Sequence, residues 1–268
     1  MRIPFLIILL VSSLAVFGCD SDTAADSNNG GTEATDEGTA EQDGDETAQD
    51  TDEADDADEA GDPDAASDLE ALDEDTRQAA LLDPSLVTDE APEEYQILFE
   101  TTQGDFTVAV DRQWGPNGAD RLFNLVRIGF FDDVAFFRVI EGFMGQFGLH
   151  GDPEVNAAWR NADIPDDEVL RSNTRGKLTF ATRGPNTRTT QLFINLGNNV
   201  TLDSQGFTPI GEVVDGMDVV DSLYDGYGEG APQGDGPSQQ RIQSEGNEYL
   251  RAEFEDLDYV ERAILIDN

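Results

Sequence analysis

A single arginine is surrounded by apolar and amide residues in the stretch Phe136-Phe137-Arg138-Val139-Ile140-Glu141-Gly142-Phe143-Met144-Gly145-Gln146. A later stretch, Gly184-Pro185-Asn186-Thr187-Arg188-Thr189-Thr190-Gln191-Leu192-Phe193-Ile194, adds a second glutamine and another phenylalanine. An arginine side chain stays charged and presents a rigid fork of hydrogen-bond donors. Arg138 could therefore donate hydrogen bonds to a molecule that rests on the neighbouring apolar side chains.

The same residues also have a purely structural interpretation. Arg138 could be a surface arginine whose aliphatic stem lies along a buried strand. The neighbouring phenylalanines and methionine could be ordinary core residues. The two glutamines could be buried amides whose hydrogen bonds are satisfied within the fold. Taken singly, the residue types leave both interpretations open.

In this order and at this spacing, the two stretches resemble the active-site signature of the cyclophilin-type peptidyl-prolyl cis-trans isomerases. The resemblance covers roughly residues 80–268. It implies that Arg138 is the catalytic residue and faces a small pocket for a substrate proline. The resemblance further implies an apolar floor made of Phe143, Met144, Phe193 and Leu202. It implies that the amides of Gln146 and Gln191 bind the substrate or position the arginine, that the backbone of Thr182 pairs with the substrate chain, and that Phe207 lies at the rim.

Three positions depart from the family pattern. Phe137 and Phe207 stand where many members have histidine, and Thr201 stands where members that bind cyclosporin tightly have tryptophan. The resemblance therefore implies weak binding of that drug. The arginine and the apolar floor are unaffected by these departures.

The implied reaction requires from the protein mainly a hydrogen-bond donor that is held in a fixed position. An X–Pro bond isomerises in tens to hundreds of seconds without help, because the planar amide is stabilised by resonance. The twisted transition state loses that resonance, and its nitrogen becomes a better hydrogen-bond acceptor. A guanidinium that binds the twisted state more tightly than the planar states accelerates the reaction. No nucleophile, acid–base pair, metal or cofactor is required.

Composition excludes several other classes of function. The chain has 268 residues, with 58 acidic against 15 basic residues and a formal charge of -43. Nucleic acid is not expected as a partner, because phosphate binding needs clustered lysine and arginine. His150 is the only histidine, which argues against a His-based triad or a multi-histidine metal site. The segment Gly226-x-Gly228-x-Gly230 lacks the Lys-Ser or Lys-Thr pair of a phosphate-binding loop.

The N-terminus resembles a bacterial lipoprotein signal peptide. Residues 1–18 begin with Arg2 and continue in an apolar run that is too short for a comfortable membrane span. Small residues precede Cys19, which is the only cysteine and would carry the acyl chains of a membrane anchor. We therefore expect a protein that is attached to the bacterial cell envelope and faces the periplasm or the exterior. Ordinary secretion with an incidental cysteine is the alternative.

Residues 19–78 are predicted to be a disordered acidic linker, because they contain too few large apolar residues to offset the entropy of ordering. The segment Asp56-Ala57-Asp58-Glu59-Ala60-Gly61 resembles the start of a calcium-binding loop, but Ala60 replaces a ligand. At the end of this region, residues 69–82 could form a short helix that extends into the domain and packs on it. The isomerase-like domain is expected to span residues 79–268.

Many short strands and few helices are expected in that domain. Strands are predicted at 95–101, 105–111, 134–140, 143–147, 178–182, 192–195, 209–213 and 259–266, and helices at 116–129, 217–224 and 248–254. This pattern fits a mainly β fold, and the resemblance implies a closed antiparallel β-barrel that is capped by two or three helices. We expect the chain to be a monomer.

The sequence leaves two functions of different classes open for the domain, and a third in which the acidic linker itself acts as a cation buffer or cell-wall spacer. The first is a membrane-tethered peptidyl-prolyl cis-trans isomerase that speeds the folding of exported proteins, with unfolded or partly folded proline-containing polypeptides as its partners. The alternative is a chaperone or scaffold module that binds proline peptides with little turnover. An isomerisation assay separates the two.

The expected lipid anchor is directly testable. Cys19→Ser should produce an unlipidated protein in a native-like bacterial host, because the substitution removes the only thiol that could be acylated. The measurement is partitioning between the detergent and aqueous phases of a Triton X-114 extraction, followed by mass spectrometry. A wild-type protein that partitions into the aqueous phase would show that Cys19 is not lipidated.

Overall fold

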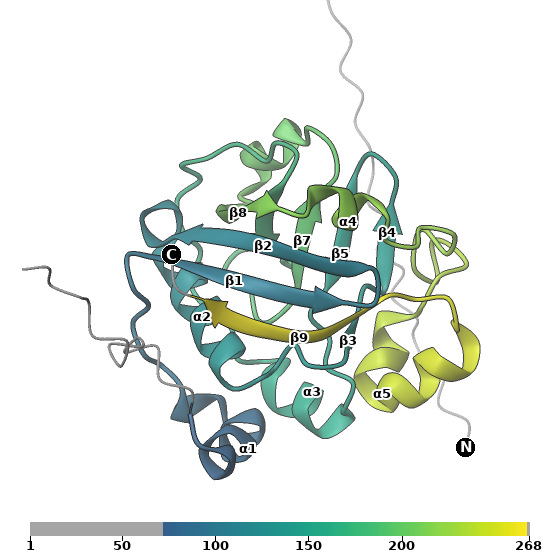
Figure 1. Ribbon diagram of the computed structural model, residues 1–268, viewed down its shortest axis with the longest axis horizontal. Helices are drawn as coiled ribbons and strands as arrows, with labels where there is room; N and C mark the ends of the chain where they lie inside the picture. The colour runs from purple at the N-terminus through teal and green to yellow at the C-terminus, as the bar shows by residue number, and fades with distance from the viewer. Residues whose placement is uncertain (1–71, 267–268) are drawn as a thin grey trace, which may run out of the picture. The chain divides into compact units, whose positions relative to one another are not determined.

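The computed structural model describes residues 72–266 (Figure 1). The expected signal peptide, Cys19 and the linker up to residue 71 lie outside the described residues. The helices are α1 (Glu74–Leu82), α2 (Pro116–Arg127), α3 (Pro153–Trp159), α4 (Met217–Asp221) and α5 (Gln239–Glu253). The strands are β1 (Glu94–Thr101), β2 (Gly104–Asp111), β3 (Val134–Ala135), β4 (Arg138–Ile140), β5 (Met144–Phe147), β6 (Lys177–Phe180), β7 (Leu192–Asn195), β8 (Pro209–Asp215) and β9 (Tyr259–Ile266).

These strands form one antiparallel sheet in the order β3-β9-β1-β2-β8-β6-β7-β5-β4. The sheet curls so that β1, β2 and β9 cross in front of β5 and β7 in Figure 1. Aromatic side chains fill the space between the two faces: the ring centroids of Phe99 on β1 and Phe147 on β5 are 5.9 Å apart, and Phe99 also stacks on Phe106 of β2. Burial of large aromatic rings stabilises this core strongly.

The mainly β prediction is confirmed, but the sheet is a curled half-barrel rather than a hydrogen-bonded ring. Its order ends at β3 and β4, which are separated in the chain only by Phe136 and Phe137. Because side chains alternate along extended backbone, these two residues point to opposite sides. Phe136 joins the main core, whereas Phe137 joins a second apolar cluster with Ile242 and Leu250 of α5.

Helices cover the open parts of the curled sheet. The sequence pattern predicts only some of these helices. α2 begins with Pro116, buries Leu122 and Leu125, and packs against β8 and β9. α3 was not predicted, and α5 begins nine residues earlier than expected from the pattern at 248–254. The first half of α5 is mostly polar, and Gly246 interrupts it at φ 59°, where the chain passes close to the Gly151 carbonyl. Apolar periodicity therefore could not reveal it.

α1 lies across the expected domain boundary at residue 79. Ala80 is fully buried, and the Leu81 carbonyl accepts a hydrogen bond of 3.0 Å from Nε1 of Trp159 on α3. The packed part of the chain therefore includes the residues from 74 onward. Within residues 72–266, no helix is long and apolar enough to cross a membrane.

A buried carboxylate ties the start of α2 to the loop that follows β6. Asp167 is 3% exposed and accepts hydrogen bonds from the backbone N–H groups of Asn117 (3.1 Å) and Gly118 (3.0 Å). It also accepts a 2.9 Å hydrogen bond from Nη2 of Arg188, which is itself 3% exposed. The loop that carries Gln191 is thus attached to a helix end through one ion pair.

Asp167→Ala should lower the free energy of unfolding by about 3–5 kcal/mol, because it removes the closest carboxylate from the buried Arg188 charge and leaves only the half-exposed Asp166 at 3.6 Å. The control is Asp221→Ala, which removes a half-exposed pair with Arg175 and should change stability by less than about 1 kcal/mol. Urea unfolding followed by circular dichroism measures both. Equal effects of the two substitutions would contradict the structural role of Asp167.

Candidate functional site

A cavity of about 310 Å³ opens beside β4, β5 and β7. All nine residues that the sequence assigned to catalysis or substrate binding line it: Arg138, Phe143, Met144, Gln146, Thr182, Gln191, Phe193, Leu202 and Phe207. Phe137, in contrast, lies outside the cavity and is buried against α5. Thr201 is exposed next to the cavity-lining Leu202.

Strand register brings the central residues together. Arg138 on β4 pairs with Gln146 on β5, and Gln146 in turn pairs with Phe193 on β7. Residues that are directly opposite in antiparallel strands have side chains on the same face, within about 4.5–5.5 Å at Cβ. The three side chains therefore form one row across the sheet. The turn between β4 and β5 contains Gly142 at φ 68°, a left-handed conformation that glycine adopts without steric penalty.

The floor of the cavity is apolar. Met144 and Phe193 are 2% and 5% exposed, and the ring of Phe193 lies edge-on to that of Phe207, with 5.8 Å between the centroids. The guanidinium carbon of Arg138 is 5.9 Å from the centroid of the Phe143 ring. A charged donor thus stands at the edge of a surface that can receive a compact apolar group.

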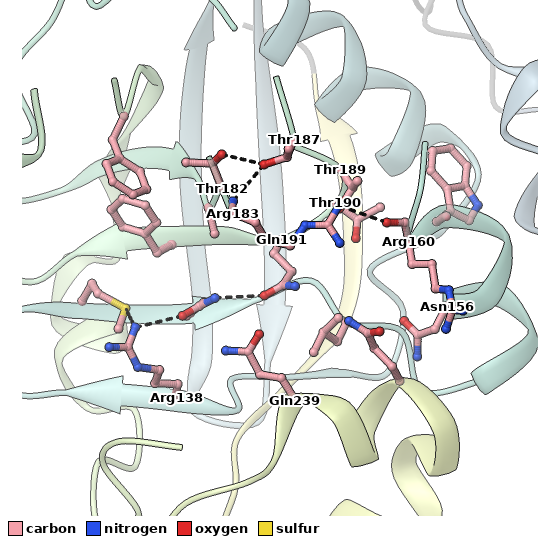
Figure 2. A pocket seen from close by; sticks show the side chains of 18 of the residues that line it. Arg138, Asn156, Arg160, Thr182, Arg183, Thr187, Thr189, Thr190, Gln191 and Gln239 are labelled. Carbon is pink, nitrogen blue, oxygen red and sulfur yellow. Dashed lines mark hydrogen bonds between the residues drawn. The ribbon is translucent and has the colours of Figure 1, made fainter. Parts of the chain in front are cut away.

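A chain of amide hydrogen bonds fixes one side of the guanidinium. Nη1 of Arg138 donates to Oε1 of Gln146 at 3.0 Å, and Nε2 of Gln146 donates to Oε1 of Gln191 at 2.9 Å. Nη1 also lies 3.8 Å from the Met144 sulfur. Figure 2 shows Arg138 and Gln191 at the two ends of this chain. The buried amide of Gln146 is thus bonded on both sides, and the linked amides orient the arginine.

A carboxylate that the sequence pattern did not reveal fixes the other side of the guanidinium. Glu229 accepts hydrogen bonds from Nε of Arg138 at 2.7 Å and from Nη2 at 2.6 Å. These charged hydrogen bonds hold the pKa of the Glu229 carboxyl below its usual range. The available signal was the acidic residue between Gly228 and Gly230 in a segment that belongs to the family resemblance, but the residue types assign it no role at the site.

Thr182 lies on the opposite wall of the cavity. Its hydroxyl bonds within its own loop, to Thr187 Oγ1 at 3.0 Å and to the Gly184 carbonyl (Figure 2). The side chain is therefore occupied with holding the loop. Thr182 would therefore contact a bound polypeptide through its backbone N–H and carbonyl groups.

A second, polar end of the cavity was not anticipated. It is lined by residues of α3, of the loop after β6 and of α5, which include Asn156, Arg160, Arg183, Gln239 and Gln243. In Figure 2, Gln239 extends from its helix toward the space between Arg138 and Gln191. The sequence could not indicate these residues, because neither α3 nor the first half of α5 was recognised as a helix.

The residues that line the cavity contribute three arginines but no carboxylate, lysine, histidine or cysteine. This composition contrasts with a chain of 58 acidic residues. Within residues 72–266, no group of three histidine, cysteine or acidic side chains is arranged to hold a metal ion. His150 is placed elsewhere, and its Nδ1 accepts a 2.9 Å hydrogen bond from the Asp152 N–H.

Comparison with known proteins points to one family. A family model described as cyclophilin type peptidyl-prolyl cis-trans isomerase/CLD matches residues 96–247. The chain is 33% identical over 135 residues to peptidyl-prolyl cis-trans isomerase B of Escherichia coli strain K12, and the matched region covers 47% of this chain and 82% of that protein. It is 34% identical over 133 residues to peptidyl-prolyl cis-trans isomerase A of Dickeya dadantii strain 3937, and that matched region covers 47% of this chain and 70% of that protein.

A solved structure supports the fold. The crystal structure of a cyclophilin-type peptidyl-prolyl cis-trans isomerase from Cryptosporidium parvum matches with a TM-score of 0.50 and 19% identity, and covers 65% of this chain and 99% of that chain. At this level of identity the match concerns the fold alone.

The ion pair between Arg138 and Glu229 predicts an acid-shifted titration. The Glu229 carboxyl should titrate below the ordinary value for glutamate in the wild-type chain and close to that value in Arg138→Ala. A group with a lowered folded-state pKa stabilises the fold fully above its unfolded pKa, and this contribution is lost as the pH falls through the folded pKa. A ¹³C NMR titration of the side-chain carboxyl measures both midpoints. The same midpoint in both proteins would show that the pair does not form in solution.

Proposed function

The chain belongs to the cyclophilin-type peptidyl-prolyl cis-trans isomerases, and we propose that the cavity around Arg138 binds proline-containing polypeptides and catalyses isomerisation of the X–Pro bond. The observation that carries this proposal is the row of Arg138, Gln146 and Phe193 across β4, β5 and β7. It places a fixed cationic donor at the edge of an apolar floor.

The floor is suited to a pyrrolidine ring. Met144 and Phe193 offer an apolar surface on which the ring could rest, and Phe207 lies edge-on to Phe193 at its border. Ligand cavities commonly have volumes of about 300–1,000 Å³, and this one, at about 310 Å³, is at the lower end of that range. The apolar floor would accept a small cyclic side chain, and the polar end of the cavity would face the rest of the bound polypeptide.

Arg138 would act on the amide nitrogen of the bound proline. In the planar ground states the nitrogen lone pair takes part in amide resonance and is a poor hydrogen-bond acceptor. In the twisted state the lone pair is released, and an N–H of the guanidinium can donate to it. Because this hydrogen bond forms only in the transition state, it lowers the barrier without tightening the ground state equally.

The remaining proposed residues hold the substrate and the arginine in place. Gln146 and Gln191 restrain the Nη1 edge of the guanidinium through their linked amides. The backbone of Thr182 would pair with the substrate chain, while Leu202 and Phe207 border the proline pocket. The reaction as proposed moves no proton.

The biological role that we propose is the folding of exported proteins from a membrane-tethered position. This part rests on the sequence alone: the apolar run of residues 1–18, the single Cys19 and the acidic segment that follows it. The formal charge of -43 favours a chain that stays away from anionic surfaces apart from its lipid anchor. Periplasmic or external polypeptides with exposed X–Pro bonds would be its substrates.

Arg138→Ala should lower kcat/KM by roughly a hundred- to thousandfold, the loss typical of removing one donor that acts in the transition state. The control is Arg262→Ala, because Arg262 forms a bidentate pair with Glu100 on the outer strands and does not line the cavity. A protease-coupled assay on an X–Pro peptide measures turnover, and circular dichroism verifies the fold.

Near-normal turnover in Arg138→Ala would refute the mechanism. A wild-type chain that binds the peptide but does not isomerise it would instead favour the alternative of a binding module. Peptide affinity measured by NMR titration distinguishes these outcomes.

A further inference from the structure

We propose that Glu229 is a positioning residue for Arg138: it grips the guanidinium from outside the cavity and thereby aims Nη1 at the substrate. This inference rests on the proposed function of Arg138. It also gives a role to the glycine-rich segment 226–236, to which the sequence pattern assigned none.

The geometry places the carboxylate behind the guanidinium. Glu229 engages Nε and Nη2 of Arg138 through two parallel hydrogen bonds of 2.7 and 2.6 Å, and Nη1 is directed to Gln146 and the Met144 sulfur. Arg138 lines the cavity, whereas Glu229 does not. A bidentate pair of this kind fixes both the plane and the rotation of the guanidinium. The edge that remains directed to the cavity is the one that the mechanism requires.

The surrounding loop is built to present the carboxylate. The Gly230 N–H donates to Oε1 of Glu229 at 2.9 Å, and the Gly236 N–H donates to the Glu229 carbonyl at 2.9 Å. A Cβ atom on Gly234 would overlap the Glu229 carbonyl, and one on Gly236 would come within 2.9 Å of it. The glycines therefore allow the loop to fold back on itself around Glu229. Both the side chain and the backbone of this residue are held.

A need for such a support follows from the position of β4. This strand is the edge of the sheet and pairs only with β5 among the described residues. The main chain of Arg138 is thus held on one side, and without Glu229 the Gln146 amide would be the only strong hydrogen-bond partner of its long side chain, beside weaker contacts with Met144 and Phe143. Glu229 supplies the second restraint, from a segment 91 residues away in sequence.

Masking is the competing interpretation, in which Glu229 neutralises Arg138 and withholds it from the substrate. The two interpretations predict opposite changes when the carboxylate is removed. Loss of a positioning residue lowers kcat, whereas loss of a mask raises it. The orientation of Nη1 toward the cavity favours positioning.

The experiment compares Glu229→Gln and Glu229→Ala with the full-length wild-type chain. Glu229→Gln keeps the side-chain length and can still accept from Gly230, so it controls for collapse of the loop. We expect kcat to fall about tenfold in the glutamine variant and up to roughly a hundredfold in the alanine variant, the scale of a misplaced catalytic group. Peptide affinity should change less than twofold, because the apolar floor is intact.

Two further measurements separate positioning from a merely structural role. In the Arg138→Ala background, Glu229→Gln should have no additional effect on kcat, since there is no guanidinium left to aim. The Arg138 Nε–H donates to Glu229 at 2.7 Å, so its NMR signal should be protected from solvent exchange in the wild type and should broaden or vanish in both Glu229 variants. Glu100→Gln is the matched control, because Glu100 forms the same two-bond pair with Arg262 away from the cavity.

Unchanged or increased kcat in Glu229→Gln would overturn the inference, and so would an additive double variant. A wild-type chain without turnover would refute the proposed function instead. In that case the Arg138 Nε–H signal decides whether Glu229 fixes the guanidinium. A signal that stays sharp in Glu229→Gln and Glu229→Ala overturns the inference, and a signal that is lost in both supports it.

Discussion

A guanidinium can stabilise a twisted amide only if it is already held in place when the substrate arrives, and the register of β4 against β5 is the constraint that achieves this. It sets Arg138 opposite Gln146, and β7 then brings Phe193 into the same row. The donor, its amide support and the apolar floor are therefore positioned by backbone hydrogen bonds. The aromatic core between the two faces of the curled sheet keeps those strands from shifting.

The edge position of β4 explains the other supports around the site. An edge strand has pairing on one side only, so the opposite side has to be covered by other parts of the chain. α5 packs on Phe137 in the second apolar cluster and holds the residue directly before Arg138. The loop that carries Glu229 then secures the side chain itself. The edge position gives Arg138 access to the cavity. The contacts with α5 and with Glu229 supply the rigidity that a strand paired on one side lacks.

The parts of the fold that could be predicted from the sequence are those with a local signal. Alternating burial in β1 and β2 follows from the period of two, and Pro116 marks the start of α2. The residues of the cavity floor could be identified because the stretches 136–146 and 184–194 carry the family signature, although their residue types alone left a core role open. Glu229 could not, because only the tertiary fold brings it to Arg138. α3, the first half of α5 and the polar end of the cavity were missed because polar helices carry little apolar periodicity.

The chemistry of the cavity is determined as much by the groups that are kept out of it as by those that line it. The chain carries 58 acidic residues, yet among residues 72–266 the lining is made of three arginines and neutral side chains, with no carboxylate. A carboxylate inside the cavity would compete with the amide nitrogen for the donors of Arg138, because a charged acceptor forms the stronger hydrogen bond. Glu229 avoids this competition by binding the opposite edge of the guanidinium. The same type of group thus supports the arginine from outside and would block it from inside, so the geometry of the pair matters more than its charge.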